Sequence, residues 1–252
     1  MKPIIDVSYY NQVTDWKAVK EAVSGVIIRM GYRGYAKGGI AYDKKYKEYR
    51  QAVEQLKIPH SFYFFPQSIT DEEAIQEAEF IARELEDAGE LMGPVWLDSE
   101  IANTETKNGR ADNLSAARRT WLLKVIIETL KTKGIVAGVY ASTSWLNNNL
   151  NMTLLPYPVW VAQYASTCKY GGSYILWQYT DKLLVPGIKG RVDASQIKIY
   201  VLPQQDTMTP ELKNAIDVIA KEVLNGRFGT GHETRSAKIY DLIKKRVNEL
   251  CS

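Results

Sequence analysis

The sequence predicts an α/β fold in which a TIM-like irregular β/α barrel is followed by a small all-α helical bundle. Short apolar runs alternate with helical patterns up to about residue 200, as in sheets built from βα units. There are eight such runs, and helices follow several of them but not all, which favours a closed, irregular barrel over an open doubly wound sheet. No G-x-G-x-x-G motif or phosphate loop is present, so we expect no nucleotide cofactor.

The expected strands are runs of Val, Ile, Leu and aromatic residues, as found where a strand is covered on both faces. They span residues 3–8, 25–31, 61–66, 94–100, 135–142, 158–164, 174–180 and 191–197. Helices are expected at residues 70–88 and 114–133. In the first helix, Thr70 and Glu73 match a capping box, and Gly89 is placed to end the helix.

Two acids follow the apolar run Val95-Trp96-Leu97 in the stretch PVWLDSE. Because side chains alternate along a strand, Asp98 and Glu100 point to the same face, roughly 7 Å apart, and Ser99 points to the other. Two carboxylates on one face repel when both are ionised, so one pKa should rise, as a general acid beside an anion requires. A strand end that simply reaches solvent is the alternative interpretation.

Further polar and aromatic side chains stand near the carboxyl ends of the expected strands, where barrels of parallel strands gather their reactive groups. The acids are Asp6, the Asp98 and Glu100 pair, and Asp193; the other side chains are Tyr63, Tyr140, Gln163, Trp177, Gln178 and Tyr179. Carboxylates among aromatic rings and amides suit a carbohydrate ligand, because sugar rings offer apolar faces and hydroxyl groups. The alternatives are core packing for the aromatic residues and, for Asp6 and Asp193, buried acids satisfied by backbone donors.

Composition and charge limit the other classes of function. The formal net charge is +3 and is spread along the chain, with no basic tail or stripe for nucleic acid. His60 and His232 lack metal-ligand spacing, and Cys168 and Cys251 form no close pair. The start of the chain has no apolar stretch long enough for a signal peptide or membrane span. We therefore expect synthesis in a reducing compartment and no membrane insertion.

Five stretches in this order, IIDVSYYNQ, PVWLDSE, VWVAQY, LWQYT and GRVDASQI, resemble glycoside hydrolase family 25, the lysozymes that cleave peptidoglycan as N-acetylmuramidases. The resemblance covers roughly residues 1–200. It implies an irregular β/α barrel with its acids at the carboxyl end, bacterial peptidoglycan as substrate, and no metal or organic cofactor. It also implies that Glu100 is the general acid/base, that Asp98 is its acidic partner, and that Asp6 and Asp193 are the other acids of the site. Whether Asp98 or the 2-acetamido group of the substrate stabilises the positive sugar stays open.

The aromatic content of the chain falls sharply near residue 203. Fifteen of the sixteen tyrosines and all six tryptophans lie before this position. We divide the chain into a catalytic barrel (1–202), a linker (203–208) and a helical domain (209–252), in which Thr209 and Pro210 begin a helix. The helical domain resembles the three-helix cell-wall-binding repeat of some phage lysozymes in its A-x-E-V-L-x-G and Y-D-x-I-x-x-R-V-N stretches, although Phe228 replaces the usual tryptophan. The expected wall-binding residues are Arg227, Phe228, Arg235 and Tyr240. This domain could also form a homodimer, or be a helical extension of the barrel with no separate role.

Together these observations predict a modular endolysin that hydrolyses peptidoglycan, is made in the host cytoplasm, and acts on the bacterial cell wall after release. A non-catalytic protein that binds cell-wall glycan is the competing interpretation, and it would require the acids to be misplaced. A carbohydrate esterase or deacetylase would need metal ligands or an activated serine, and Ser99 has no histidine in a recognisable relation to it. A bacterial autolysin with its own export route also stays open.

Overall fold

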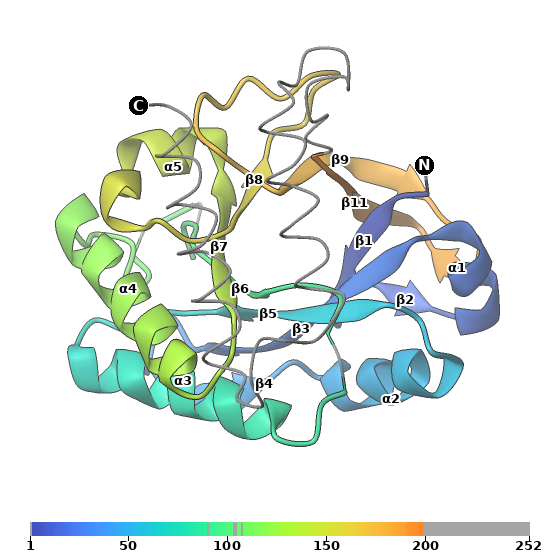
Figure 1. Cartoon of the computed structure of the whole chain (residues 1–252), viewed down its shortest axis with the longest axis horizontal. Helices are drawn as coiled ribbons and strands as arrows, with labels where there is room; N and C mark the ends of the chain where they lie inside the picture. The colour runs from blue at the N-terminus through green and yellow to red at the C-terminus, as the bar shows by residue number, and fades with distance from the viewer. Residues whose placement is uncertain (1, 90, 103–104, 107, 199–252) are drawn as a thin grey trace, which may run out of the picture. The chain divides into compact units, whose positions relative to one another are not determined.

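The computed structural model describes residues 2–89, 91–102, 105–106 and 108–198, which contain a closed eight-stranded barrel (Figure 1). The barrel strands are β1 (Ile4–Val7), β3 (Gly25–Arg33), β5 (His60–Phe65), β6 (Val95–Asp98), β7 (Ala137–Ser142), β8 (Val159–Ala162), β9 (Leu176–Leu184) and β11 (Arg191–Ile197). Each lies on one of the eight apolar runs picked out in the sequence. The predicted irregular β/α barrel is thereby confirmed.

The barrel closes because β1 pairs on both of its sides. It runs parallel to β3 and antiparallel to β11, so the order round the barrel is β1-β3-β5-β6-β7-β8-β9-β11. The seven strands from β1 to β9 in this order are parallel to one another. The eighth, β11, is antiparallel to both of its neighbours, β9 and β1. We expected all eight strands to run parallel, and this expectation is wrong for β11.

A short connection accounts for the reversal of β11. Only residues 185–190 separate β9 from β11, whereas a parallel crossover needs roughly a dozen residues or more. Within this connection, the carbonyl of Gly187 accepts hydrogen bonds from the backbone N–H groups of Thr14 (2.7 Å) and Asp15 (3.1 Å). Gly187 has a φ of +88°, and a Cβ there would collide with the carbonyl oxygen of Asp15, so the turn requires glycine.

Helices lie on the outside of the barrel (Figure 1). They are α1 (Trp16–Ala22), α2 (Tyr46–Leu56), α3 (Asp71–Leu85), α4 (Ala116–Thr132) and α5 (Thr143–Asn148), with a 3₁₀ turn η1 (Met152–Leu154). Three further short strands are β2 (Gln12–Val13), β4 (Ile40–Tyr42) and β10 (Ile188–Lys189). Of these, β2 pairs with β10, and β4 pairs antiparallel with the end of β3. No helix within the described residues is long and apolar enough to cross a membrane.

The two helices predicted from the sequence correspond to α3 and α4, with shifted ends. The hydroxyl of Thr70 caps α3 by accepting the N–H of Glu73 (3.2 Å). The Glu73 carboxylate accepts the N–H of Ile69 (2.8 Å) instead of that of Thr70, so the capping box is only half formed. The helix ends at Leu85, so the expectation that Gly89 ends it is wrong.

The apolar core forms two layers, one on each face of the barrel strands. The inner layer consists of Ile4, Ile27, Trp96, Trp160 and Leu176, with Tyr63, Met92 and Tyr140 packed against it. A larger outer layer consists of apolar residues from the strands and from the helices around them. Alternation along each strand produces the two layers: Trp96 belongs to the inner layer, and its neighbours Val95 and Leu97 belong to the outer one. Aromatic side chains therefore fill the barrel interior.

The described barrel belongs to a unit that ends at Lys198. The predicted linker and the predicted helical domain lie outside the described residues. So do the expected wall-binding residues Arg227, Phe228, Arg235 and Tyr240. For this part of the chain, the domain organisation and the homodimer stay predictions from sequence.

Candidate active site

A polar cavity of about 180 Å³ opens at the carboxyl end of the parallel strands. Its lining residues are Asp6, Tyr63, Asp98, Glu100, Tyr140, Trp160, Tyr164, Gln178 and Asp193. The structure therefore brings together all four acids named from the sequence and three of the six other side chains. These residues come from β1, β5, β6, β7, β8, β9 and β11 or from the segments that follow them.

Asp6 and Asp193 face each other across the antiparallel pair of β1 and β11, where they are register partners. Asp193 stands near the beginning of its strand, not near its carboxyl end as in the other strands. It still reaches the cavity because β11 runs in the opposite direction, which places its beginning among the carboxyl ends of the parallel strands. The predicted location of Asp193 was right, but the expected reason for it was wrong.

Asp98 is the last residue of β6, and Glu100 follows in a bend beyond the strand. We expected the strand to continue to Glu100 and to align the two side chains by simple alternation. The strand is shorter, yet both residues line the cavity. One oxygen of Asp98, Oδ1, is buried and has no hydrogen-bond partner among the described residues.

Burial raises the pKa of both members of this pair. The pKa of Asp98 lies well above its usual value because of burial, then the charges of Glu100 and Asp6, with Arg29 opposing the shift. Burial and then the charge of Asp193 raise the pKa of Glu100. From the sequence we expected only one pKa to rise, with Asp98 as the anion. In the structure the two carboxyl groups shift in the same direction.

The other two acids are shifted in the same sense. The pKa of Asp6 lies well above its usual value because of burial and then the charge of Asp193, and the hydrogen bond from Gln178 opposes this. Burial, followed by the charge of Asp181, raises the pKa of Asp193 to about 6. The cavity thus retains protons at pH values where exposed carboxyl groups have lost them, which is the condition for acid catalysis near neutral pH.

A chain of hydrogen bonds joins four polar side chains of the cavity wall: Tyr140, Tyr164, Gln178 and Asp6. The hydroxyl groups of Tyr140 (2.8 Å) and Tyr164 (3.2 Å) both donate to Oε1 of Gln178. The amide Nε2 of Gln178 in turn donates to Oδ2 of Asp6 (3.0 Å). Because its oxygen is taken by two donors, the buried amide has only one orientation, and it directs an N–H group at Asp6. Gln178 therefore holds the Asp6 carboxyl group in place.

Two lining residues were missed in the sequence. Trp160 lies in the inner layer, where its ring centroid is 4.4 Å from that of Tyr140, its register partner on β7. Tyr164 follows the end of β8 and is 54% exposed. Both stand in the run PVWVAQY, in which we singled out only Gln163. The alternation of Trp160 between two valines was a usable signal for an inward-facing side chain.

Three predicted residues do not line the cavity: Gln163, Trp177 and Tyr179. Trp177 belongs to the outer apolar layer, and its Nε1 donates to the backbone carbonyl of Gln163 (2.8 Å). The ring of Tyr179 packs edge-on against Trp177 at 6.0 Å. Since Gln178 faces inwards, alternation along β9 turns both of its aromatic neighbours outwards.

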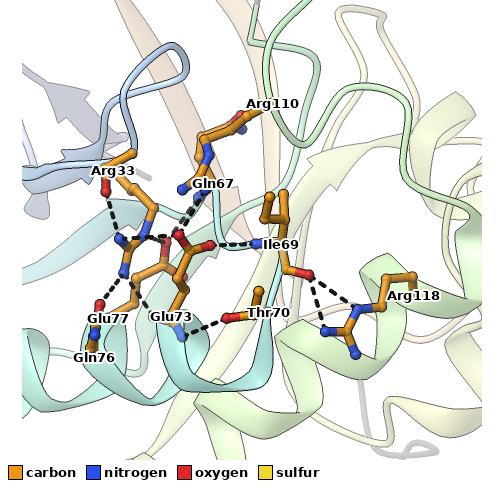
Figure 2. A network of polar contacts seen from close by, with 10 residues as sticks. Arg33, Gln67, Ile69, Thr70, Glu73, Gln76, Glu77, Arg110 and Arg118 are labelled. Atoms are coloured by element: carbon orange, nitrogen blue, oxygen red, sulfur yellow. Dashed lines mark hydrogen bonds and ion pairs between the residues drawn. The ribbon is translucent and has the colours of Figure 1, made fainter.

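A buried ion-pair network braces the loops at this end of the barrel (Figure 2). Arg33, the last residue of β3, donates from Nε to Oε1 of Glu77 on α3 (2.8 Å), and the backbone N–H of Gln67 donates to the same oxygen (3.0 Å). Arg110 donates from Nη2 to Oε1 of Glu73 (2.7 Å). Burial raises the pKa of Glu77 to about 7, opposed by Arg33. The network joins the end of β3 and the segments after β5 and β6 to α3.

A closed β/α barrel whose carboxyl end holds several carboxyl groups and aromatic rings in one cavity has the architecture of a barrel glycoside hydrolase. The family model for glycosyl hydrolases family 25 matches residues 5–188, and the chain belongs to this family.

The chain is similar to proteins of several bacteria and a phage. An autolytic lysozyme of Clostridium acetobutylicum is 27% identical over 203 residues, which make up 79% of this chain and 56% of the relative. The modular autolysin LytC from Streptococcus pneumoniae, solved in complex with a synthetic peptidoglycan ligand, is 28% identical with a TM-score of 0.67, over 77% of this chain and 46% of that one. The chain spans about half the length of these two proteins.

A third similar structure is the catalytic domain of endolysin ply40 from bacteriophage P40 of Listeria monocytogenes. It is 21% identical with a TM-score of 0.61, over 78% of this chain and 92% of that one. At this identity the likeness is one of fold.

Proposed function

We propose that the protein is a peptidoglycan hydrolase, an N-acetylmuramidase or lysozyme that cleaves the β-1,4 bond between N-acetylmuramic acid and N-acetylglucosamine. The observation that carries this proposal is the cavity of a family 25 barrel in which Asp6, Asp98, Glu100 and Asp193 meet and have raised pKa values. The similarity to an autolytic lysozyme, and to an autolysin solved with a peptidoglycan ligand, supports the same substrate class.

In this mechanism Glu100 is the general acid. Burial and the charge of Asp193 raise the pKa of its carboxyl group, so it keeps a proton to higher pH than an exposed glutamate does. It donates this proton to the glycosidic oxygen as the bond to the anomeric carbon breaks. The resulting carboxylate then accepts a proton from the attacking water, which restores the acid.

The positive charge on the sugar ring is stabilised in one of two ways. Either the carboxylate of Asp98 acts directly, or the 2-acetamido oxygen of the substrate, oriented by Asp98 and Asp193, bonds to the anomeric carbon. The two routes differ in what they require of the substrate. On N-deacetylated peptidoglycan, the direct route retains activity and the substrate-assisted route loses it.

The bond that is cleaved can be identified from the products. Purified peptidoglycan is digested with the protein, the products are reduced with borohydride, and the new reducing-end sugar is identified. We expect muramitol. Glucosaminitol would mean a glucosaminidase on the same barrel, and the absence of any new reducing end would favour the non-catalytic wall-binding protein.

Glu100→Gln tests the acid itself. The substitution keeps the size of the side chain but removes the proton donor, so the variant should fold like the wild type and lose at least about a hundredfold in the rate of reducing-end release. Circular dichroism and thermal unfolding provide the folding control. Retained activity would remove Glu100 from the acid role.

The protein further acts as a modular endolysin that is made in the host cytoplasm and reaches the wall after the membrane has been breached. The support is the sequence resemblance of residues 209–252 to a phage wall-binding repeat. Produced in the cytoplasm of a bacterium with a susceptible wall, the protein should cause lysis only after the membrane is permeabilised. Lysis of intact producing cells would favour an autolysin with its own export route.

A further inference from the structure

Two exposed tyrosines follow β1 at the end of the barrel where the cavity opens. Residues 8–11 follow β1 directly after Asp6 and Val7, and they form a turn held by the hydrogen bond from Ser8 N–H to the side-chain oxygen of Asn11 (2.9 Å). Tyr9 is 37% exposed and Tyr10 is 74% exposed, and their ring centroids lie 3.9 Å apart. The two rings together form an exposed aromatic surface.

Two cations accompany these rings. The guanidinium carbon of Arg29 lies 5.1 Å from the ring centroid of Tyr9 and 5.3 Å from that of Tyr10, and Nζ of Lys44 lies 5.3 Å from that of Tyr9. We call Tyr9, Tyr10, Arg29 and Lys44 the rim platform. Cations at these distances from aromatic faces are held by cation–π attraction.

Buried Asp43 organises the rim platform. Its Oδ2 accepts hydrogen bonds from Nε of Arg29 (2.7 Å) and from the backbone N–H of Tyr9 (3.2 Å), and it pairs with Nη2 of Arg29 (2.6 Å). Asp43 thus neutralises Arg29. Lys44 is exposed and has no ion-pair partner among the described residues, so it leaves a positive charge directed at solvent.

The rim platform adjoins a strand residue that lines the cavity. Arg29 on β3 is the register partner of Tyr63 on β5, and Tyr63 lines the cavity. The charge of Arg29 acts on the carboxyl group of Asp98, which places the guanidinium within electrostatic range of the reacting pair. A polymer bound in the cavity beside Tyr63 can therefore extend to the rim platform.

The chemistry of the rim platform matches one part of the proposed substrate. Aromatic faces stack on sugar rings, and an unpaired ammonium group pairs with a carboxylate. The two N-acetylated sugars of peptidoglycan are uncharged when each muramic acid carries its peptide, so carboxylates are found only on the stem peptides. A neutral polysaccharide would give Lys44 nothing to bind.

We propose that the rim platform is a binding subsite for a peptide-bearing muramic acid residue of the glycan strand, in which Tyr10 stacks on the sugar and Lys44 pairs with a carboxylate of the stem peptide. This assignment rests on the proposed function, because it makes the rim platform an extension of the peptidoglycan cleft. It predicts that the enzyme distinguishes peptide-bearing strands from bare ones.

The test compares two substrates and four variants of the full chain. One substrate is peptidoglycan freed of teichoic acid. The other is the same material after an amidase has removed the stem peptides and the lactyl carboxyl groups that this exposes have been converted to uncharged amides. The variants are Lys44→Ala and Tyr10→Ala, with Lys133→Ala and Trp121→Ala on the exposed surface of the barrel as controls. Reducing-end release gives kcat/KM for each combination.

Lys44→Ala should lose roughly threefold in kcat/KM on the peptide-bearing substrate, the size of an exposed ion pair, and should match the wild type on the stripped one. Tyr10→Ala should lose roughly fivefold on both, since both contain the sugar. The controls should not change. The subsite is refuted if Lys44→Ala equals the wild type on peptide-bearing material, or if it loses equally on both substrates.

A separate measurement distinguishes this result from a failure of the proposed function. If the wild type releases no reducing ends from either substrate, the muramidase proposal fails. The subsite is then tested by binding of soluble strands to Glu100→Gln and to the double variant with Lys44→Ala. Weaker binding of peptide-bearing strands alone by the double variant supports the subsite, and equal binding by both proteins refutes it.

Discussion

At the residue scale, the four acids of the cavity have different surroundings and therefore different tasks. Asp6 is held by Gln178, and Asp98 is buried with a free oxygen. Asp193 is only partly buried, and its pKa of about 6 is set by burial and by Asp181. Its charge in turn raises the pKa of both Asp6 and Glu100. The ionisation of Asp193 thus affects the pKa values of Asp6 and Glu100.

Asp193→Asn should move the alkaline limb of the activity profile. The charge of Asp193 is one of the causes that raise the pKa of Glu100, so its removal lowers that pKa and shifts the alkaline limb of kcat/KM to lower pH. Asp181→Asn is the matched control, since Asp181 acts on Asp193 and is not among the causes for Glu100. An alkaline limb that stays in place in Asp193→Asn would contradict this electrostatic role.

The same variant has a predicted effect on stability. An acid whose pKa is higher in the folded than in the unfolded protein makes the folded state bind more protons, so the free energy of unfolding falls as pH rises through the window between the two values. For Asp193 this window runs from 3.8 to about 6. Thermal unfolding of Asp193→Asn should show a weaker fall over this window than the wild type.

At the element scale, the tight connection between β9 and β11 determines how the barrel closes. It turns the chain back so that β11 fits between β9 and β1. Gly187 and Gly190 both lie in this connection with positive φ, +88° and +87°. Only Gly187 is also packed against the backbone of Asp15, because space around Gly190 is open.

Gly187→Ala and Gly190→Ala form a matched pair that separates backbone strain from packing. Gly190→Ala should destabilise the protein by about 1–2 kcal/mol, the cost of a left-handed conformation for a residue with a Cβ. Gly187→Ala adds a collision with the Asp15 carbonyl oxygen and should cost roughly 2–4 kcal/mol. Urea unfolding measures both, and equal losses would show that the contact with Asp15 contributes nothing.

Most of the elements could be predicted because the apolar runs and helix periodicities are strong local signals. The direction of β11 could not be read from its own residues, since alternation is the same in parallel and antiparallel strands. Its clue was the short interval after residues 174–180. The end of α3 was predicted too late. Glycine commonly ends helices, so Gly89 was expected to end α3, but the helix ends at Leu85.

The acids were predictable because acidic residues after apolar runs are rare and conspicuous. To predict which neighbouring side chains enter the cavity, one has to know which alternate residues of each strand point inwards. In β9, Gln178 points inwards, so Trp177 and Tyr179 point outwards. The network around Arg33 and Glu77 left no sequence signal, since its members are distant in the chain and meet only after the barrel has formed.

At the scale of the whole molecule, the barrel alone accounts for the proposed chemistry, whereas residues 209–252 are expected to bring it to the wall. Phe228→Ala in the full chain should weaken co-sedimentation with purified walls and leave the hydrolysis of soluble muropeptide strands unchanged. Trp121→Ala, on the exposed surface of α4, is the control for a general loss of aromatic surface. Undiminished sedimentation of Phe228→Ala would assign wall affinity to other residues.

The pairing of β1 with β11 makes the site dependent on the time course of synthesis. Asp6 stands in the first strand of the barrel sequence, but its partner Asp193 is synthesised only when that sequence is nearly complete. Chains are made from the amino terminus at roughly 5–20 residues per second, so a nascent chain spends most of its synthesis with an open sheet and without Asp193. Prematurely terminated chains that lack β11 should accordingly release no reducing ends from purified peptidoglycan.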